Sequence, residues 1–187
     1  MTRSLVRPVL TLLRYLSYVC APQALFGLMN LVTRPFGGML SDILYRAFGS
    51  GTTGMRGRLL TVVICLLWEG CFLCIMSRQK HLDITIILLV LFAVGCQMGN
   101  GSIYSVVPYV EPTATGSVAG IVGAMGNAGA VAWSLLFRFG PKLAADSFYV
   151  LGFIVLGISA AVPLISIKGY NGLIFRARGE PAGLNTY

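Results

Sequence analysis

The sequence has 187 residues, of which 56% are hydrophobic and 11% are charged, and its mean hydropathy is +0.81. Soluble domains usually carry about a quarter charged residues, so this composition excludes an ordinary soluble protein and indicates a membrane protein. The net charge of +8 does not indicate nucleic-acid binding, because the cations lie mostly in short loops and tails between apolar runs, where they face lipid headgroups.

Five apolar segments are long enough to cross the hydrocarbon core of a bilayer, which needs about 20 helical residues. In chain order they are residues 15–40, 59–76, 84–107, 116–137 and 148–167. Only helices and closed barrels satisfy their backbones in lipid, and the alternation that barrel strands need is absent. The sequence therefore predicts an all-α integral membrane protein, with a poorly defined lead-in over residues 1–14, a helix bundle over 15–168 and a polar tail over 169–187.

The first span, residues 15–40, is interrupted by Pro22 and Pro35 and holds a permanent cation, Arg34. An arginine near the centre of a span costs ~2.5–3.5 kcal/mol even on the lenient insertion scale. Three interpretations stay open: an ion pair with Glu69, snorkelling toward the loop that follows, or an unpaired cation that awaits an anionic ligand. The guanidinium group is planar and presents paired donors, which suits a small planar oxyanion.

The longest connection, residues 41–58, carries a charged motif. Asp42 stands at the end of the first span, and Arg46 and Arg58 follow in the same loop. An acidic side chain that faces arginines across a short loop can latch neighbouring helices in one of two states. The alternative is an ordinary solvated loop, whose charge pairs contribute little stability.

The third span is unusually polar in its second half, which reads "GCQMGNGSIYSVVPY". Asn100 and Tyr104 are four residues apart there and share a helix face. The pattern fits either a closely packed helix that kinks before Pro108 or a face on a water-filled cavity.

The fourth span is rich in glycine and reads "GSVAGIVGAMGNAGAVAW". Gly120, Gly123 and Asn127 share one helix face, and Gly126 belongs to a second row of small residues. Small residues let helices pack closely in lipid. The alternative adds that bare backbone and the Asn127 amide line a polar passage, since an amide at this depth needs a hydrogen-bond partner.

The cysteines and the single histidine offer no clear catalytic or metal-binding set. All five cysteines lie inside apolar runs, which argues against a secreted disulfide framework. Cys71 and Cys74 form a C-x-x-C spacing in mid-helix without a second pair of ligands, which favours a small apolar role. His81 lacks the partners of a metal site or of Ser-His catalysis. We therefore expect no metal, no cofactor and no enzymatic activity.

Together these motifs resemble the major facilitator superfamily and, within it, the nitrate/nitrite porter family. "GGMLSD" followed by "MRGRL" is similar to the superfamily's loop motif between helices eight and nine, and "NLVTRPFGGMLSD" resembles helix eight of the porters. "GNGSIYSVVP" and "GSVAGIVGAMGNAGA" resemble helices ten and eleven, the latter being a nitrate signature. The resemblance covers Ala24 to Trp133, continues more weakly to Ile167, and points to eukaryotic high-affinity nitrate transporters. It implies helices eight to twelve of a twelve-helix fold, the C-terminal half of a transporter.

The resemblance also implies roles for individual residues. Arg34 takes the place of an arginine that contacts nitrate, and Glu69 stands where the family is expected to have a small or neutral residue. The predicted substrate-binding residues are Arg34, Asn100, Tyr104, Gly120, Gly123, Gly126 and Asn127. The predicted gating motif consists of Gly38, Asp42, Arg46 and Arg58.

The implied function is nitrate or nitrite transport, which we expect in the plasma membrane, by alternating access of two halves around an anion site at the bilayer midplane. This sequence would supply half of that site, because it has no counterpart of the family's arginine on helix two or of its signature on helix five. We expect the partner to be the missing N-terminal half or another membrane chain, and no uptake by this chain alone. Two alternatives stay open: a truncated membrane interaction protein that does not transport, and a transporter of another small anion.

Overall fold

The computed structural model of the chain describes residues 3–139 and 144–176. Over these residues it consists of five α-helices and two short 3-10 helices, without strands. The α-helices are α1 (Arg3–Ala47), α2 (Met55–Ser77), α3 (Leu82–Val110), α4 (Thr115–Phe139) and α5 (Ala144–Ala161), and the 3-10 helices are η1 (Pro112–Ala114) and η2 (Val162–Leu164). The structure has one helix for each of the five long apolar runs in the sequence, as predicted.

Within the part of the chain that the structure describes, four helical segments are long and apolar enough to cross a membrane: Met55–Ser77, Leu82–Val110, Pro112–Phe139 and Ala145–Leu164. They coincide with the last four predicted spans, so the prediction of an all-α membrane protein is confirmed. The helix α1, which carries Arg34, Asp42 and Arg46, is not among the four.

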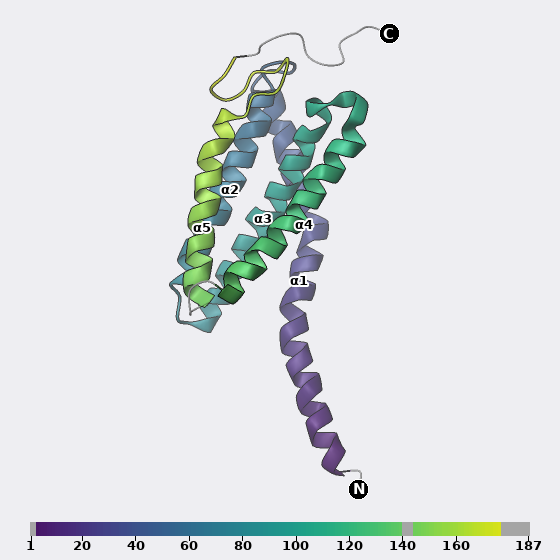
Figure 1. The fold of residues 1–187 in the computed structure, drawn as a ribbon, viewed down its shortest axis with the longest axis vertical. Helices are drawn as coiled ribbons and strands as arrows, with labels where there is room; N and C mark the ends of the chain where they lie inside the picture. The colour runs from purple at the N-terminus through teal and green to yellow at the C-terminus, as the bar shows by residue number, and fades with distance from the viewer. Residues whose placement is uncertain (1–2, 140–143, 177–187) are drawn as a thin grey trace.

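The helix α1 is continuous over 45 residues and extends well beyond the other helices at its N-terminal end (Figure 1). It begins at Arg3 and runs through Pro22 and Pro35, where the sequence predicts interruptions. It also ends later than predicted, at Ala47, so that Asp42 and Arg46 lie on its last two turns and not in a loop. Arg46 is favourable there because a helix C-terminus carries a partial negative charge.

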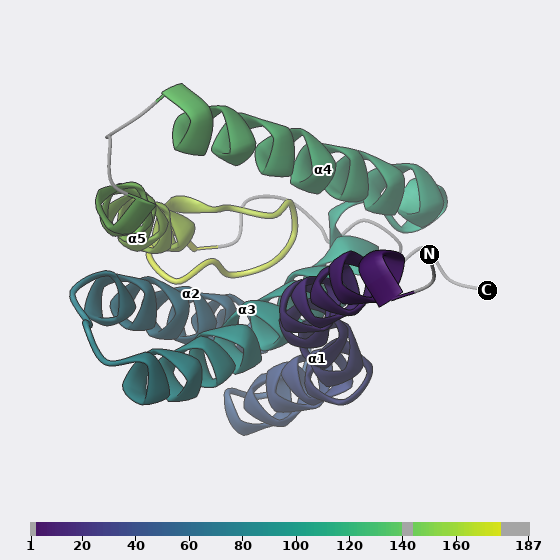
Figure 2. The same ribbon diagram turned by 90° about the horizontal axis from the view of Figure 1, so that it is seen from below.

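The helices α2 and α3 form the centre of the bundle, with α1 packed against α3 and α5 packed against α2. Seen from below, α4 lies as a separate layer on the far side of the bundle from α1, α2 and α3 (Figure 2). No residue of α4 is buried, whereas the apolar core gathers Met55, Leu59, Val62, Val162 and Ile167. Burying apolar side chains is the main stabilising term in such a core, so α4 is the least supported helix of the bundle.

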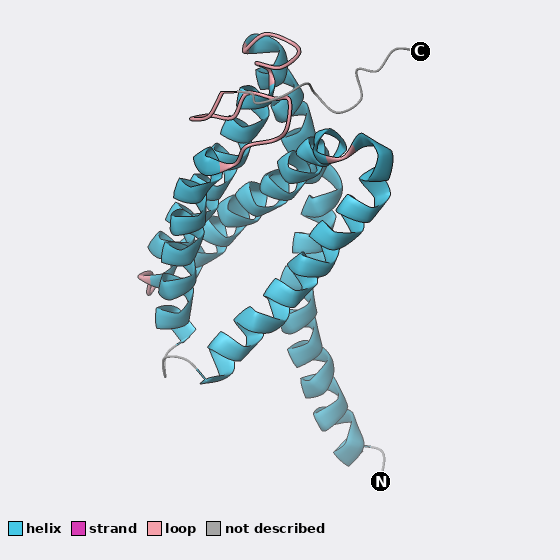
Figure 3. Cartoon of the chain, turned by 45° about the horizontal axis from the view of Figure 1, so that its top comes forward, coloured by secondary structure: helices cyan, strands magenta, loops and turns pink. Residues whose placement is uncertain are grey.

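The connection between α1 and α2 lies at the same end of the molecule as the segment after η2 (Figure 3). The backbone N–H of Asn171 donates to the carbonyl oxygen of Thr52 at 2.9 Å, and the Arg56 Nε donates to the Gly172 carbonyl oxygen at 3.1 Å. The predicted polar tail therefore begins with residues that cover the loop, and its residues 177–187 lie outside the described part of the chain.

Candidate functional site

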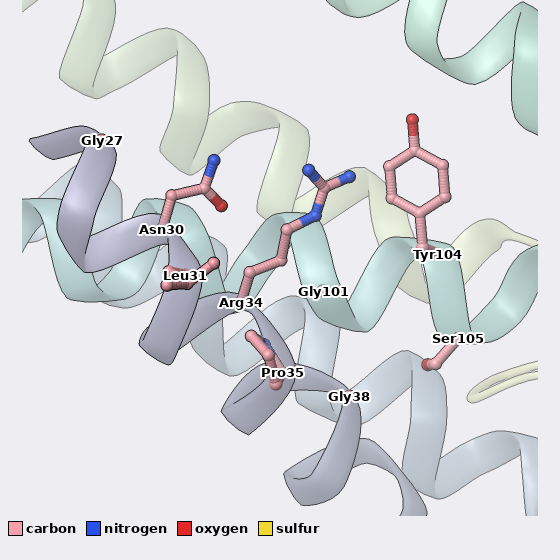
Figure 4. A pocket seen from close by; sticks show the side chains of 9 residues that line it. All are labelled: Gly27, Asn30, Leu31, Arg34, Pro35, Gly38, Gly101, Tyr104 and Ser105. Carbon is pink, nitrogen blue, oxygen red and sulfur yellow. The ribbon is translucent and has the colours of Figure 1, made fainter.

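A pocket of about 610 Å³ lies between α1 and α3 and contains Arg34. The side chains of Asn30, Arg34 and Tyr104 point to the same side, whereas that of Ser105 points the other way, toward Gly38 (Figure 4). The lining residues are Gly27, Asn30, Leu31, Arg34, Pro35 and Gly38 from α1, with Gly101, Tyr104 and Ser105 from α3. Arg34 is the charged residue of this set, so the cation lies among apolar and neutral polar residues.

Two glycines bring the walls of the pocket into backbone contact. A methyl group added at Gly101 of α3 would collide with the carbonyl oxygen of Arg34, and one added at Gly37 of α1 would collide with the carbonyl group of Met98. Only glycine leaves room for two helix backbones to approach so closely. The crossing of α1 and α3 therefore fixes the backbone of Arg34 against Gly101.

The guanidinium group of Arg34 lies over the ring of Tyr104, with Cζ 4.8 Å from the ring centroid. Among residues 3–139 and 144–176, the ion pair that forms is between Arg58 and Asp42, and Arg34 has no carboxylate partner. The Glu69 carboxyl group instead lies beside the Cys96 thiol. The structure thus does not form the Arg34–Glu69 pair that the sequence leaves open, and Arg34 is held by an aromatic face.

The remaining predicted binding residues are divided between the pocket and the surface. Tyr104 lines the pocket, and a methyl group added at Gly123 of α4 would lie 3.3 Å from its hydroxyl oxygen. Gly120 and Gly126 have no atom within 4 Å of such a methyl group. Asn100 and Asn127 are exposed. Of the seven predicted residues, Arg34 and Tyr104 line the pocket and Gly123 lies beside the Tyr104 hydroxyl, and the other four lie elsewhere.

Asn30 lines the pocket and was not predicted from the sequence. It precedes Arg34 by four residues, and this spacing places both side chains on the same helix face. An amide inside an apolar run needs a partner. These two features together form the signal that would have identified Asn30.

The charged motif brings together Asp42, near the end of α1, and Arg58, on the first turn of α2. The Arg58 Nη2 lies 2.7 Å from the Asp42 Oδ1, with the arginine side chain 8% exposed and the aspartate 57% exposed. A methyl group added at Gly57 would collide with the carbonyl group of Leu44, so glycine allows this turn of α2 to lie against α1. Two predicted members lie outside the pair, since Arg46 is exposed and Gly38 lines the pocket.

Aromatic rings enclose the buried Arg58 side chain. Its Cζ lies 4.7 Å from the ring centroid of Tyr45 and 4.8 Å from that of Tyr109, and its Nη2 donates to the Tyr109 hydroxyl at 3.2 Å. Tyr170, from the segment after η2, packs edge-on against Tyr109 with centroids 5.4 Å apart. Burial, together with the neighbouring Tyr109 and Tyr45, raises the pKa of Tyr170. The cation is therefore enclosed by tyrosines of α1 and α3, and the C-terminal segment packs against the second of these.

A short chain of hydrogen bonds joins this enclosure to the pocket. The Arg58 Nη1 donates to the Ser41 hydroxyl at 3.5 Å, and the hydroxyl groups of Ser41 and Ser105 are 2.6 Å apart. Ser105 lines the pocket of Arg34. The charged motif and the pocket are thus parts of one connected polar arrangement between α1, α2 and α3.

The cysteine and acidic side chains do not add a metal centre to this arrangement. Cys71 and Cys74 are free thiols. Within residues 3–139 and 144–176, no three His, Cys, Asp or Glu side chains come together in a way that could hold a metal ion. The chemistry that the site offers is binding through one guanidinium, an aromatic ring and neutral polar groups.

Comparison with known proteins shows that the chain is similar to several proteins that are named as transporters. It is 34% identical to "Nitrate transporter 2.1" of Chlamydomonas reinhardtii over 151 residues, which are 77% of this chain and 26% of that protein. It is 32% identical to "High affinity nitrate transporter 2.5" of Arabidopsis thaliana over 151 residues, 80% of this chain and 29% of that protein. It is also 34% identical to "Elsinochrome transporter 1" of Elsinoe fawcettii over 140 residues, 74% of this chain and 26% of that protein.

No family model and no solved structure matches the chain. The chain spans about a quarter of the length of the curated relatives it matches. The similarity to the nitrate transporters nevertheless extends over about three quarters of this chain. The chain is therefore similar to nitrate transporters over most of its length, as the resemblance to the nitrate/nitrite porter family predicts.

Proposed function

We propose that this chain supplies half of the anion site of a membrane transporter for nitrate or nitrite. The observation that carries the proposal is Arg34, a permanent cation that enters a pocket without a carboxylate partner among the described residues. An unpaired cation inside a membrane protein costs free energy, and such residues usually belong to functional sites. The names of the relatives, which are nitrate transporters, support the choice of ligand.

The chemistry of the pocket suits a small planar oxyanion. The guanidinium of Arg34 offers parallel N–H donors that match two oxygens of one anion. The ring of Tyr104 lies 4.8 Å from its Cζ and limits the orientations that the guanidinium can adopt. Such binding makes and breaks no covalent bond, so the proposed role is transport and not catalysis.

We assign the second half of the site to another part of a longer transporter or to another membrane chain. Gly120, Gly126 and Asn127 of α4 stay in the proposed site, because their exposed positions leave them available to such a partner. Alternating access then requires the two halves to rock around the anion. We assign the Asp42–Arg58 pair to one of the two resulting states, as a latch between α1 and α2.

Two preparations in liposomes test the proposal. The first contains the full chain alone, and the second contains a fusion transporter in which the full chain replaces the aligned segment of Chlamydomonas nitrate transporter 2.1. We expect uptake of isotope-labelled nitrate by the fusion transporter and none by the chain alone. Robust uptake by the chain alone would overturn the half-site. A fusion transporter that reaches the membrane but takes up neither nitrate nor nitrite would favour the non-transporting interaction protein.

The role of Arg34 is tested in the same fusion transporter. Arg34→Lys keeps the charge but loses the paired donors, and we expect the apparent KM for nitrate to rise by about tenfold or more. An unchanged KM would remove Arg34 from the site.

Competition by other small anions identifies the second candidate, a transporter of another oxyanion, because a single guanidinium binds many of them. A fluorescent tag on the chain tests the proposed plasma-membrane location.

A further inference from the structure

Asn30 is a pocket residue whose amide is not fully used by the fold. It stands one helical turn before Arg34 on α1 and lines the same pocket. Its amide and the Arg34 guanidinium project to the same side, and Arg34 lies between Asn30 and Tyr104 in the view of Figure 4. An amide group thus flanks the cation on one side and an aromatic ring flanks it on the other.

The Oδ1 atom of Asn30 is shielded from solvent and has no hydrogen-bond partner among the described residues. Leaving a buried acceptor unpaired costs about 1–3 kcal/mol. Nearby hydroxyl groups on the same two helices are paired, since Thr33 donates to the Met29 carbonyl oxygen at 2.7 Å and Ser105 donates to that of Ser102 at 2.6 Å. The unpaired atom is the acceptor, and the NH2 group of the same amide points to the side on which the Arg34 guanidinium lies (Figure 4), so the donor is the part of Asn30 that an anionic ligand can engage.

An asparagine amide carries an acceptor and two donors, and a half-turn of the amide plane exchanges them. Toward an anion, the group that matters is the NH2 donor. The Tyr104 ring faces Arg34, and its hydroxyl lies beside Gly123 of α4. Asn30 is therefore the neutral donor on the α1 side of the cation.

Nitrate and nitrite differ in the number of oxygen atoms that can accept a hydrogen bond from such a donor. Both are planar and negatively charged, and a guanidinium fork pairs with two oxygens of either one. Nitrate has a third oxygen, which needs a further donor, and nitrite has none at that position. A site that holds a donor for an atom that the competing ligand lacks discriminates strongly, because the donor stays unpaired with the wrong ligand.

We infer that Asn30 determines the specificity of this pocket: its amide donates to the nitrate oxygen that Arg34 does not hold, and it thereby favours nitrate over nitrite. The inference rests on the proposed function, since it concerns the ligand of the same pocket. It adds a residue that neither the sequence motifs nor the similarity to nitrate transporters assigns.

The test compares the two anions in the fusion transporter. Asn30→Leu keeps the approximate size of the side chain and removes the donor, and we expect the KM for nitrate to rise about tenfold, with that for nitrite within about twofold. Thr33→Val is the matched control, a polar-to-apolar change on the same helix outside the pocket lining, and it should leave both KM values within about twofold. Asn30→Gln, which retains an amide, should keep the preference for nitrate.

Three outcomes would overturn the inference. They are an equal change for both anions in Asn30→Leu, no change for either anion, and a loss of preference in Asn30→Gln equal to that in Asn30→Leu. If Asn30→Leu does not reach the membrane, Asn30→Ser replaces it, and the same ratio of the nitrate KM to the nitrite KM is measured. The serine side chain is shorter, so its hydroxyl donor does not reach the anion. A failure of the proposed function is distinguished by Arg34→Lys, which would then leave the nitrate KM unchanged as well.

Discussion

Arg34 and Tyr104 form a cation–π pair across the pocket, with the guanidinium carbon 4.8 Å from the ring centroid. The two residues belong to α1 and α3, whose backbones touch at Gly101 beside Arg34. The cation is thus positioned by a neighbouring helix through packing and an aromatic face, without an opposite charge that an anion would have to displace. In the proposed site the full charge of Arg34 stays available to the ligand.

The ring of Tyr104 and its hydroxyl are separable by substitution. In the fusion transporter, Tyr104→Phe keeps the aromatic face, and we expect the nitrate KM to stay within about threefold. Tyr104→Leu removes the face and should raise the KM by about fivefold or more, because a cation–π contact contributes roughly 0.5–2 kcal/mol. Equal effects in both variants would show that the hydroxyl, and not the ring, acts on the ligand.

The backbone contact between α1 and α3 predicts a steric effect at Gly101. In Gly101→Ala the added methyl group would collide with the carbonyl oxygen of Arg34, and overpacking of this kind costs about 1–3 kcal/mol. We expect a lower midpoint of thermal unfolding for the chain in detergent. Gly129→Ala is the control, since a methyl group there has no atom within 4 Å. Similar midpoints for Gly101→Ala and the unmodified chain would contradict the close crossing.

The two partners of the Asp42–Arg58 ion pair should respond unequally to substitution. Asp42 is 57% exposed, and exposed members of ion pairs contribute about 0–1 kcal/mol, so Asp42→Asn should lower the free energy of unfolding only slightly. Arg58 is buried among Tyr45, Tyr109 and Ser41, and Arg58→Ala should cost about 3–5 kcal/mol. Denaturation in detergent measures both. Equal losses would indicate that the pair, and not the enclosure, stabilises this end of the bundle.

The sequence alone predicts the helices and the principal cation, but not the arrangement around them. Long apolar runs predict helical spans, because in lipid the backbone must satisfy its own hydrogen bonds. Arg34 is recognisable because a charged residue is unusual inside an apolar run. A row of small residues indicates that another helix can pack closely against it, but it does not indicate which helix does so. The helix that packs there is therefore not predictable from the sequence. Thus Gly101, and not Gly120 or Gly126, makes the close helix crossing at the pocket.

The position of the charged motif was mispredicted for a similar reason. Asp42 and Arg46 were expected in a loop after the apolar run, whereas α1 continues to Ala47. Tyr45 and its contacts with Arg58 and Tyr109 stabilise this last stretch of helix through residues distant in the sequence. The sequence does carry a signal for Asn30, an amide inside an apolar run one helical turn before Arg34, but only the structure shows that both residues line one pocket.

The segment after η2 gives a prediction about pH. The pKa of Tyr170 is raised by burial and by Tyr109 and Tyr45, so the folded chain holds the phenolic proton more tightly than the unfolded chain does. The contribution of Tyr170 is therefore complete below the ordinary tyrosine pKa of about 10 and is lost as the pH rises through the higher folded value. Tyr170→Phe keeps the edge-on ring against Tyr109 and removes the proton. We expect the unfolding midpoint of the chain to fall more steeply above about pH 10 than that of Tyr170→Phe, and parallel curves would place Tyr170 in an environment no different from water.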